Sequence, residues 1–194
     1  MSKHTLKTLV KKRSSHPLFR YYGKITEASI HTLVTNFDEY SQTTDSAKHL
    51  REALVSKDKQ ENYHTIEHYN QYDIQTCNHG DEITEDNFKI VPIIMQPVYD
   101  EISYMLNSPV CRMRYATLDV KQKLPYHIDQ PGNDRFIVVL KGEQVINIRT
   151  KTDTIQRLML PGEVWYINSN WDHQVINIGN SQRLAMLGCF TYND

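Results

Sequence analysis

The stretch RFIVVLKGEQVINIRTKTDTIQRLMLPGEVWYIN, residues 135–168, decides how we interpret the fold of this chain. It contains four short stretches rich in Val, Ile and Leu, which cover residues 135–140, 144–149, 155–160 and 163–168. Lys141-Gly142 and Pro161-Gly162 are dipeptides typical of turns, and they separate neighbouring stretches. Short apolar stretches bounded by such turns predict consecutive β-strands.

The same pattern of short apolar segments continues on both sides of this stretch. We expect further strands at residues 112–118, 174–178 and 183–190, with no helices between the strands. Many short strands at near-regular spacing predict a β-sandwich or a jelly-roll barrel. Before residue 108 the pattern is helix-like, with expected helices at 46–59 and 97–106. We therefore predict an α+β, mainly β, single domain over 1–194. Residues 1–107 would be mostly helix and loop packed outside, and 108–194 would form the β core.

Composition excludes several classes of protein. The 22 Lys and Arg residues nearly balance the 23 Asp and Glu residues, which argues against sequence-independent nucleic-acid binding. No apolar run approaches the roughly 20 residues of a membrane span, so we expect no membrane contact. Cys77, Cys111 and Cys189 are an odd number of widely spaced cysteines, so they predict no disulfide framework. We expect a reducing, cytoplasmic location.

A histidine–carboxylate pair lies in the middle of the predicted β core. His127 and Asp129 are two residues apart, and in an extended chain their side chains leave the same face, about 6–7 Å apart along the backbone. His173 follows, and Arg183 comes ten residues after it. Two imidazoles and one carboxylate are the ligand set of a non-haem Fe(II) facial triad, which leaves coordination positions open. A buried arginine would bind the far carboxylate of a keto-acid co-substrate through two parallel hydrogen bonds.

Residues 111–190 resemble the Fe(II)/2-oxoglutarate-dependent oxygenases, and most closely the aspartyl/asparaginyl β-hydroxylase and free-proline hydroxylase branch. The resemblance rests on an ordered set of motifs: Leu124-Pro-Tyr-His-Ile-Asp129, Pro161-Gly-Glu-Val-Trp-Tyr166, Asn168-Ser-Asn-Trp-Asp-His173 and Arg183. It implies a cupin-like double-stranded β-helix. It also implies a dioxygenase that uses Fe(II), 2-oxoglutarate and O2 to hydroxylate an unactivated C–H of an amino acid or amino-acid side chain. Succinate and CO2 would be released.

The resemblance also implies roles for particular residues. His127, Asp129 and His173 would bind iron, and Arg183 would pair with the C5 carboxylate of 2-oxoglutarate. Arg135, eight residues after His127, matches a second arginine that the branch uses near the same carboxylate. The branch usually reads Arg-x-His at this point, whereas this chain has Ile137, which donates no hydrogen bond. The role of Arg135 therefore stays open.

Two further residues are candidates for lining the site. Asn147 would do so if its strand face points inward. Trp165 is a candidate for substrate contact, although core packing is the favoured interpretation for it. A cupin-type metalloprotein, either an isomerase or a 2-oxoglutarate-independent dioxygenase, is an alternative function, since Pro161-Gly-Glu163 with His173 is similar to the second cupin motif. A non-catalytic ligand-binding barrel is another. The expected partner is a small-molecule or peptide substrate, and the oligomeric state cannot be predicted.

Overall fold

A computed structural model describes residues 16–43, 69–73, 93–129 and 134–192. The described helices are α2 (Glu27–Thr43), the short 3-10 helix η2 (Ile93–Met95) and α5 (Gln96–Leu106). The described strands are β1 (Phe19–Lys24), β2 (Tyr69–Asp73), β3 (Val110–Leu118), β4 (Lys123–His127), β5 (Asp134–Lys141), β6 (Gln144–Arg149), β7 (Thr154–Met159), β8 (Glu163–Ile167), β9 (Asp172–Asn177) and β10 (Arg183–Phe190).

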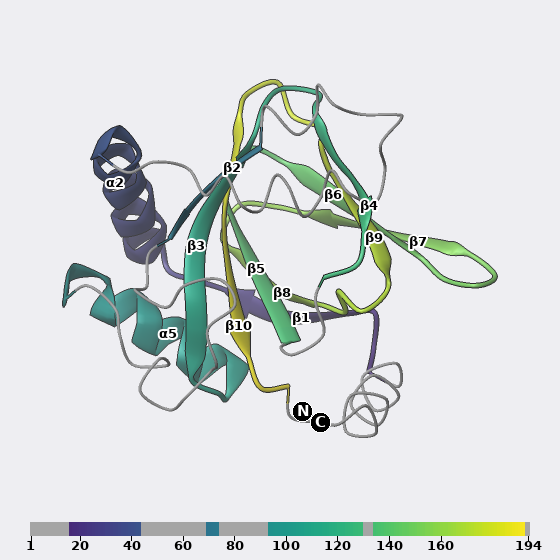
Figure 1. Ribbon diagram of the computed structural model, residues 1–194. Coiled ribbons are helices and arrows are strands. Elements are labelled where there is room, and N and C mark those ends of the chain that lie inside the picture. Colours follow the sequence, from purple (N-terminus) through teal and green to yellow (C-terminus); the bar gives the residue numbers. More distant parts are fainter. Residues whose placement is uncertain (1–15, 44–68, 74–92, 130–133, 193–194) are drawn as a thin grey trace.

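The strands form two antiparallel sheets that face each other. The larger sheet has the order β1-β8-β5-β10-β3-β2, and the smaller has the order β4-β9-β6-β7 (Figure 1). From β3 to β10, every connection except the β6–β7 hairpin crosses from one sheet to the other. Crossing between two antiparallel sheets in this way is the topology of a jelly roll. The jelly-roll prediction therefore agrees with the observed strand order.

Each strand of the larger sheet sends alternate side chains to opposite faces. On the inner face, Ile137 of β5 and Ala185 of β10 pack against Ile146 and Ile148 of β6 in the smaller sheet. On the outer face, the neighbouring side chains form a second hydrophobic cluster. The space between the sheets is thus mostly apolar, and any charged side chain on an inner face stands out.

The two long helices contribute to the outer cluster. Leu33 of α2 and Ile102 of α5 are fully buried in it, together with Phe136 of β5 and Tyr166 of β8. Figure 1 shows both helices beside β3, on the side of the larger sheet away from the smaller one. Within the described residues, no helix is long and apolar enough to cross a membrane.

The structure adds elements that the sequence did not predict. The strands expected after residue 108 are present as β3 and β5 to β10, and the helix expected at 97–106 is α5. In contrast, α2, β1, β2 and β4 were not predicted. Strand β1 pairs with β8, and β2 pairs with β3, so the first 107 residues supply both edges of the larger sheet. The helix expected at 46–59 lies outside the described residues.

Strand β4 was missed because of its proline. Pro125 lacks a backbone N–H, so sequence rules demote a strand that contains it. The structure places β4 at the edge of the smaller sheet, where only its β9 side needs ladder hydrogen bonds. The register with β9 shifts between Leu124 and His127, at the position of the proline. An edge position therefore accommodates Pro125 and still brings His127 beside β9.

Candidate metal centre

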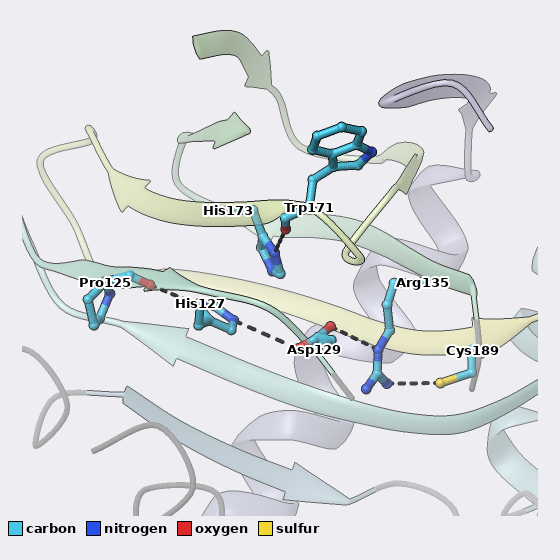
Figure 2. A network of polar contacts seen from close by, with 7 residues as sticks. All are labelled: Pro125, His127, Asp129, Arg135, Trp171, His173 and Cys189. Carbon is cyan, nitrogen blue, oxygen red and sulfur yellow. Dashed lines mark hydrogen bonds and ion pairs between the residues drawn. The ribbon is translucent and has the colours of Figure 1, made fainter. Parts of the chain in front are cut away.

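The two predicted histidine ligands lie directly opposite each other on neighbouring strands. His127 ends β4, His173 is the second residue of β9, and they are register partners in the antiparallel pair. Their ring centroids are 4.2 Å apart. His173 alternates along β9 with outward-facing residues, so its ring points between the sheets, where it is only 3% exposed. Figure 2 shows both rings turned toward each other.

Asp129 completes the cluster from the segment that follows β4. Its backbone N–H donates to the carbonyl of Ser169 at 3.1 Å, which ties this segment to the loop before β9. Its Oδ1 lies 3.7 Å from Nε2 of His127. Potential ligand atoms of His127, Asp129 and His173 all lie within 4.8 Å of one another. The structure thus brings together the three residues that were predicted from the sequence as metal ligands.

The backbone orients both imidazoles for metal binding. Nδ1 of His127 lies 2.8 Å from the carbonyl oxygen of Pro125, and Nδ1 of His173 lies 3.0 Å from that of Trp171. Because a carbonyl only accepts hydrogen bonds, each Nδ1 carries the proton. Each Nε2 therefore keeps its lone pair for another partner. Metal-binding histidines usually donate their second N–H in this way, so the residues fit a divalent metal ion.

The charge states of the cluster also fit metal binding. Burial and, to a smaller extent, the neighbouring His127 lower the pKa of His173 to about 4, so His173 is neutral at physiological pH. For Asp129, burial acts to raise the pKa of the carboxyl, but attraction to Arg135 and to the two histidines outweighs it. The pKa of Asp129 therefore lies well below its usual range. A metal ion would meet one carboxylate and a neutral imidazole at these two positions.

Arg135 lies next to this cluster, but it contacts Asp129. The Nε of Arg135 donates to Oδ2 of Asp129 at 3.1 Å. Its Nη1 contacts Sγ of Cys189 at 2.9 Å. A hydrogen bond with Cys111, together with the nearby charge of Arg135, lowers the pKa of the Cys189 thiol to about 6, against the effect of burial. Sequence reasoning did not find Cys189 as a neighbour of the site, because nothing in its own strand distinguishes it from a core cysteine.

Arg183 is buried deeper between the sheets. It is 1% exposed, and it lies on the same face of β10 as Ala185, which packs in the inner cluster. Its Nη1 donates to the carbonyl of Ala116 at 3.0 Å. Arg114 of β3 lies on the same inner face as Ala116 and is 6% exposed. Arg114 was not predicted, although a charged residue two positions before an inward alanine on a predicted strand is a usable signal.

Of the two residues expected to line the site, Trp165 lies on an inner face and Asn147 does not. Trp165 packs at the margin of the inner cluster, and its Nε1 donates to Glu163 at 3.0 Å. Asn147 alternates with Ile146 and Ile148, which both take inner positions. Its amide contacts Gln174 on the outer face of the smaller sheet, so the condition under which Asn147 would line the site is not met.

Some solved structures share part of this fold at low similarity. An oxalate oxidase in complex with the substrate analogue glycolate is 22% identical, with a TM-score of 0.38 over 43% of this chain and 43% of that one. Peruvianin-I, a cysteine peptidase from Thevetia peruviana latex, is 13% identical, with a TM-score of 0.37 over 42% of this chain and 50% of that one. The Drosophila melanogaster CENP-C cupin domain is 12% identical, with a TM-score of 0.36 over 41% and 59%. The chain thus spans 43% to 59% of these structures.

Sequence comparison identifies the family. No curated protein matches the chain. The profile of the aspartyl/asparaginyl beta-hydroxylase family matches residues 30–191, which include the three clustered residues and most of the described elements. Because this match covers more than three quarters of the sequence, the chain belongs to the aspartyl/asparaginyl beta-hydroxylase family.

Proposed function

We propose that this protein is an Fe(II)- and 2-oxoglutarate-dependent dioxygenase. It would hydroxylate an unactivated C–H of an amino acid, either free or as a side chain in a peptide. In the balanced reaction, 2-oxoglutarate, O2 and R–H give succinate, CO2 and R–OH. The observation that carries this proposal is the convergence of His127, Asp129 and His173 within 4.8 Å. Membership in a hydroxylase family supports it.

The three side chains suit Fe(II) in particular. Two imidazoles and one carboxylate are the ligands of non-haem Fe(II) oxygenases, and they leave positions open for a co-substrate and dioxygen. Bound iron would supply the redox chemistry, while the protein supplies ligands, orientation and a shielded interior. Asp129 also separates this site from the alternative cupin interpretation, in which the first motif usually carries a second histidine at that position.

The buried charges support a dicarboxylate co-substrate. Among the described residues, the arginines buried to less than a tenth exposure are Arg114, Arg135 and Arg183, and all three lie on inner faces. Among the described carboxylates, Asp134 is the one buried to that extent. It lies on the opposite face of β5, where its Oδ2 accepts a hydrogen bond from the backbone N–H of Tyr192, just after β10. Of the three inward guanidinium groups, that of Arg135 forms an ion pair with Asp129. An interior that presents several guanidinium groups favours an anionic co-substrate such as 2-oxoglutarate, because arginine binds carboxylates through charge-assisted hydrogen bonds.

Arg183 is the residue that we assign to the far carboxylate of 2-oxoglutarate. It is nearly fully buried, and a guanidinium binds a carboxylate through two parallel hydrogen bonds. Asp129 and both histidines lie toward the other end of the barrel, near the start of β9. The co-substrate would thus lie between the metal ion and Arg183, with its two ends held by different groups.

The direct test is turnover of 2-oxoglutarate. Purified protein is incubated with Fe(II), ascorbate and 2-oxoglutarate, first with free amino acids and then with peptides, and succinate is measured. We expect succinate above an iron-free control and none from His173→Ala. Arg149→Met is the matched control, because Arg149 contacts Asp172, the neighbour of His173, from the exposed outer face. The proposal fails if no candidate substrate raises succinate above the iron-free control.

A further inference from the structure

The two oxygens of Asp129 have different neighbours. Oδ1 lies 3.7 Å from Nε2 of His127, on the side of the two imidazoles. Oδ2 accepts a hydrogen bond from Nε of Arg135 at 3.1 Å. In Figure 2, Asp129 lies between His127 on one side and Arg135 on the other. The carboxylate therefore has one oxygen toward the candidate metal position and one engaged by a guanidinium.

Arg135 is itself held in place. It belongs to the inner face of β5, is 8% exposed, and is the register partner of Cys189 on the neighbouring strand β10. Its Nη1 contacts Sγ of Cys189 while its Nε contacts Asp129, so the planar guanidinium is fixed at two of its edges. Cys189 is fully buried and comes from the middle of the larger sheet. Rigid strands thus determine where the guanidinium meets Asp129.

We propose that Arg135 is a positioning residue for the carboxylate ligand of the metal, and that Cys189 orients Arg135 for this task. This inference rests on the metal site of the proposed function. Arg135 holds Oδ2, so that Oδ1 alone faces the imidazoles. A carboxylate that binds through one oxygen occupies a single coordination position, and the positions needed for the co-substrate and dioxygen stay open.

The geometry separates this role from co-substrate binding. The resemblance placed Arg135 near the 2-oxoglutarate carboxylate, but a guanidinium engaged with Asp129 and Cys189 has fewer donors left for a second carboxylate. Ile137, the next inward residue on β5, also lacks the hydrogen-bonding group found in the branch. Arg183 lies elsewhere on the inner face and remains the candidate for the co-substrate. The two arginines therefore serve different ends of the site.

The test compares four variants of the full-length protein: Arg135→Met, Cys189→Ala, Arg183→Met and the outer-face control Arg149→Met. Affinity for Co(II) is measured by anaerobic titration, without 2-oxoglutarate or turnover. Removing a group that orients a metal ligand typically weakens metal binding by about 10- to 100-fold, and we expect this for Arg135→Met. Cys189→Ala should weaken binding in the same direction but less. Arg149→Met should change it by less than about threefold, as for an exposed ion pair.

Two further readouts distinguish positioning from general damage to the fold. The visible absorption spectrum of bound Co(II) reports its coordination, and it should change in Arg135→Met, where Oδ2 is released, but not in Arg149→Met. Binding of 2-oxoglutarate to protein saturated with Co(II), measured by equilibrium dialysis, should weaken strongly in Arg183→Met and by less than about threefold in Arg135→Met.

In the double variant, Arg135→Met with Cys189→Ala, metal affinity should match that of Arg135→Met alone, because the two residues act through one contact.

Several results would overturn the inference. One is that Arg135→Met binds Co(II) with the affinity of the wild type and gives the same absorption spectrum. Another is loss of 2-oxoglutarate binding in that variant with metal affinity retained. If Arg135→Met does not fold, the Co(II) affinity of Cys189→Ala tests the inference instead. An affinity equal to that of the wild type in Cys189→Ala would refute the role of Cys189 in orienting Arg135. Failure of the proposed function looks different: metal affinity depends on Arg135 as expected, yet no substrate supports succinate formation.

Discussion

Acid should destabilise the metal-free protein, and His173 should be a main cause. This side chain is 3% exposed, and burial followed by repulsion from His127 lowers its pKa to about 4. In the unfolded chain a histidine takes up its proton near its ordinary pKa of about 6.5. Between these values the unfolded chain binds a proton that the folded protein does not. The free energy of unfolding therefore falls as the pH is lowered from about 6.5 to about 4.

The size of the effect follows from the two pKa values of His173. Their difference, 6.5 − 4, is about 2.5, and at about 1.4 kcal/mol for each pH unit the full loss is about 3 kcal/mol. Between pH 7 and pH 4.5, where the titration is incomplete, the loss is about 2 kcal/mol. Asp129 contributes in the same direction, but its pKa is held below the usual range, so its contribution is lost only at still lower pH.

The measurement is urea unfolding of protein freed of metal by chelation, at pH 7 and at pH 4.5. Wild type is compared with His173→Gln, whose side chain does not titrate, so that contributions from all other groups cancel. Between the two pH values, the free energy of unfolding should fall by about 2 kcal/mol more in the wild type than in the variant. An equal loss in both proteins would refute the reasoning, as would an NMR titration that places the pKa of His173 near its ordinary value.

Two further changes test separate parts of the structure. Arg183→Met should raise the 2-oxoglutarate concentration needed for half-maximal succinate formation by about tenfold or more, since a buried carboxylate then lacks its guanidinium partner; an unchanged requirement would contradict this assignment. Gly188→Ala should destabilise the fold by about 1–3 kcal/mol. A Cβ at this position would lie 2.5 Å from Cζ of the buried Phe136 and 3.2 Å from the carbonyl oxygen of Cys111. Urea unfolding measures the change, and a stability equal to that of the wild type would show that the ring moves aside freely.

The strands that sequence reasoning found and those that it missed differ in physical character. Strands β5 to β8 combine apolar side chains with clear turns, and Gly142 and Gly162 at those turns take positive φ angles of 76° and 83°. Such local signals suffice to predict a strand. Strands β1, β2 and β4 are all at sheet edges, and Pro125 interrupts β4. Edge strands need fewer hydrogen bonds and less apolar surface, so their sequences carry weaker signals. Strand β7 is also at an edge, but the Pro161-Gly162 turn that follows it marks its end.

The candidate site could be predicted in part. The two-residue spacing of His127 and Asp129 places them on one face of an extended chain, and the register of β4 with β9 brings the predicted ligand His173 beside them. Alternation does not say which face is the inner one. In β6 both faces carry apolar residues, Val145 on one and Ile146 on the other, so the pattern cannot decide the direction of the residues between them. For this reason the sequence left the direction of Asn147 open.

The role of Arg135 could not be predicted, because its partners come from two other segments that only the folded chain brings together. Asp129 lies six residues before it, in the chain segment that follows β4, while Cys189 lies 54 residues after it and becomes its neighbour only when β10 pairs with β5. Local pattern predicts that Arg135 is part of a strand, but it cannot say which acceptors the folded chain brings to its guanidinium. Under the proposed function, Arg135 acts on the carboxylate of the metal site, and Arg183 is the arginine assigned to the co-substrate. Substitutions at 135 and 183 should therefore separate metal binding from co-substrate binding, although both arginines belong to the same barrel interior.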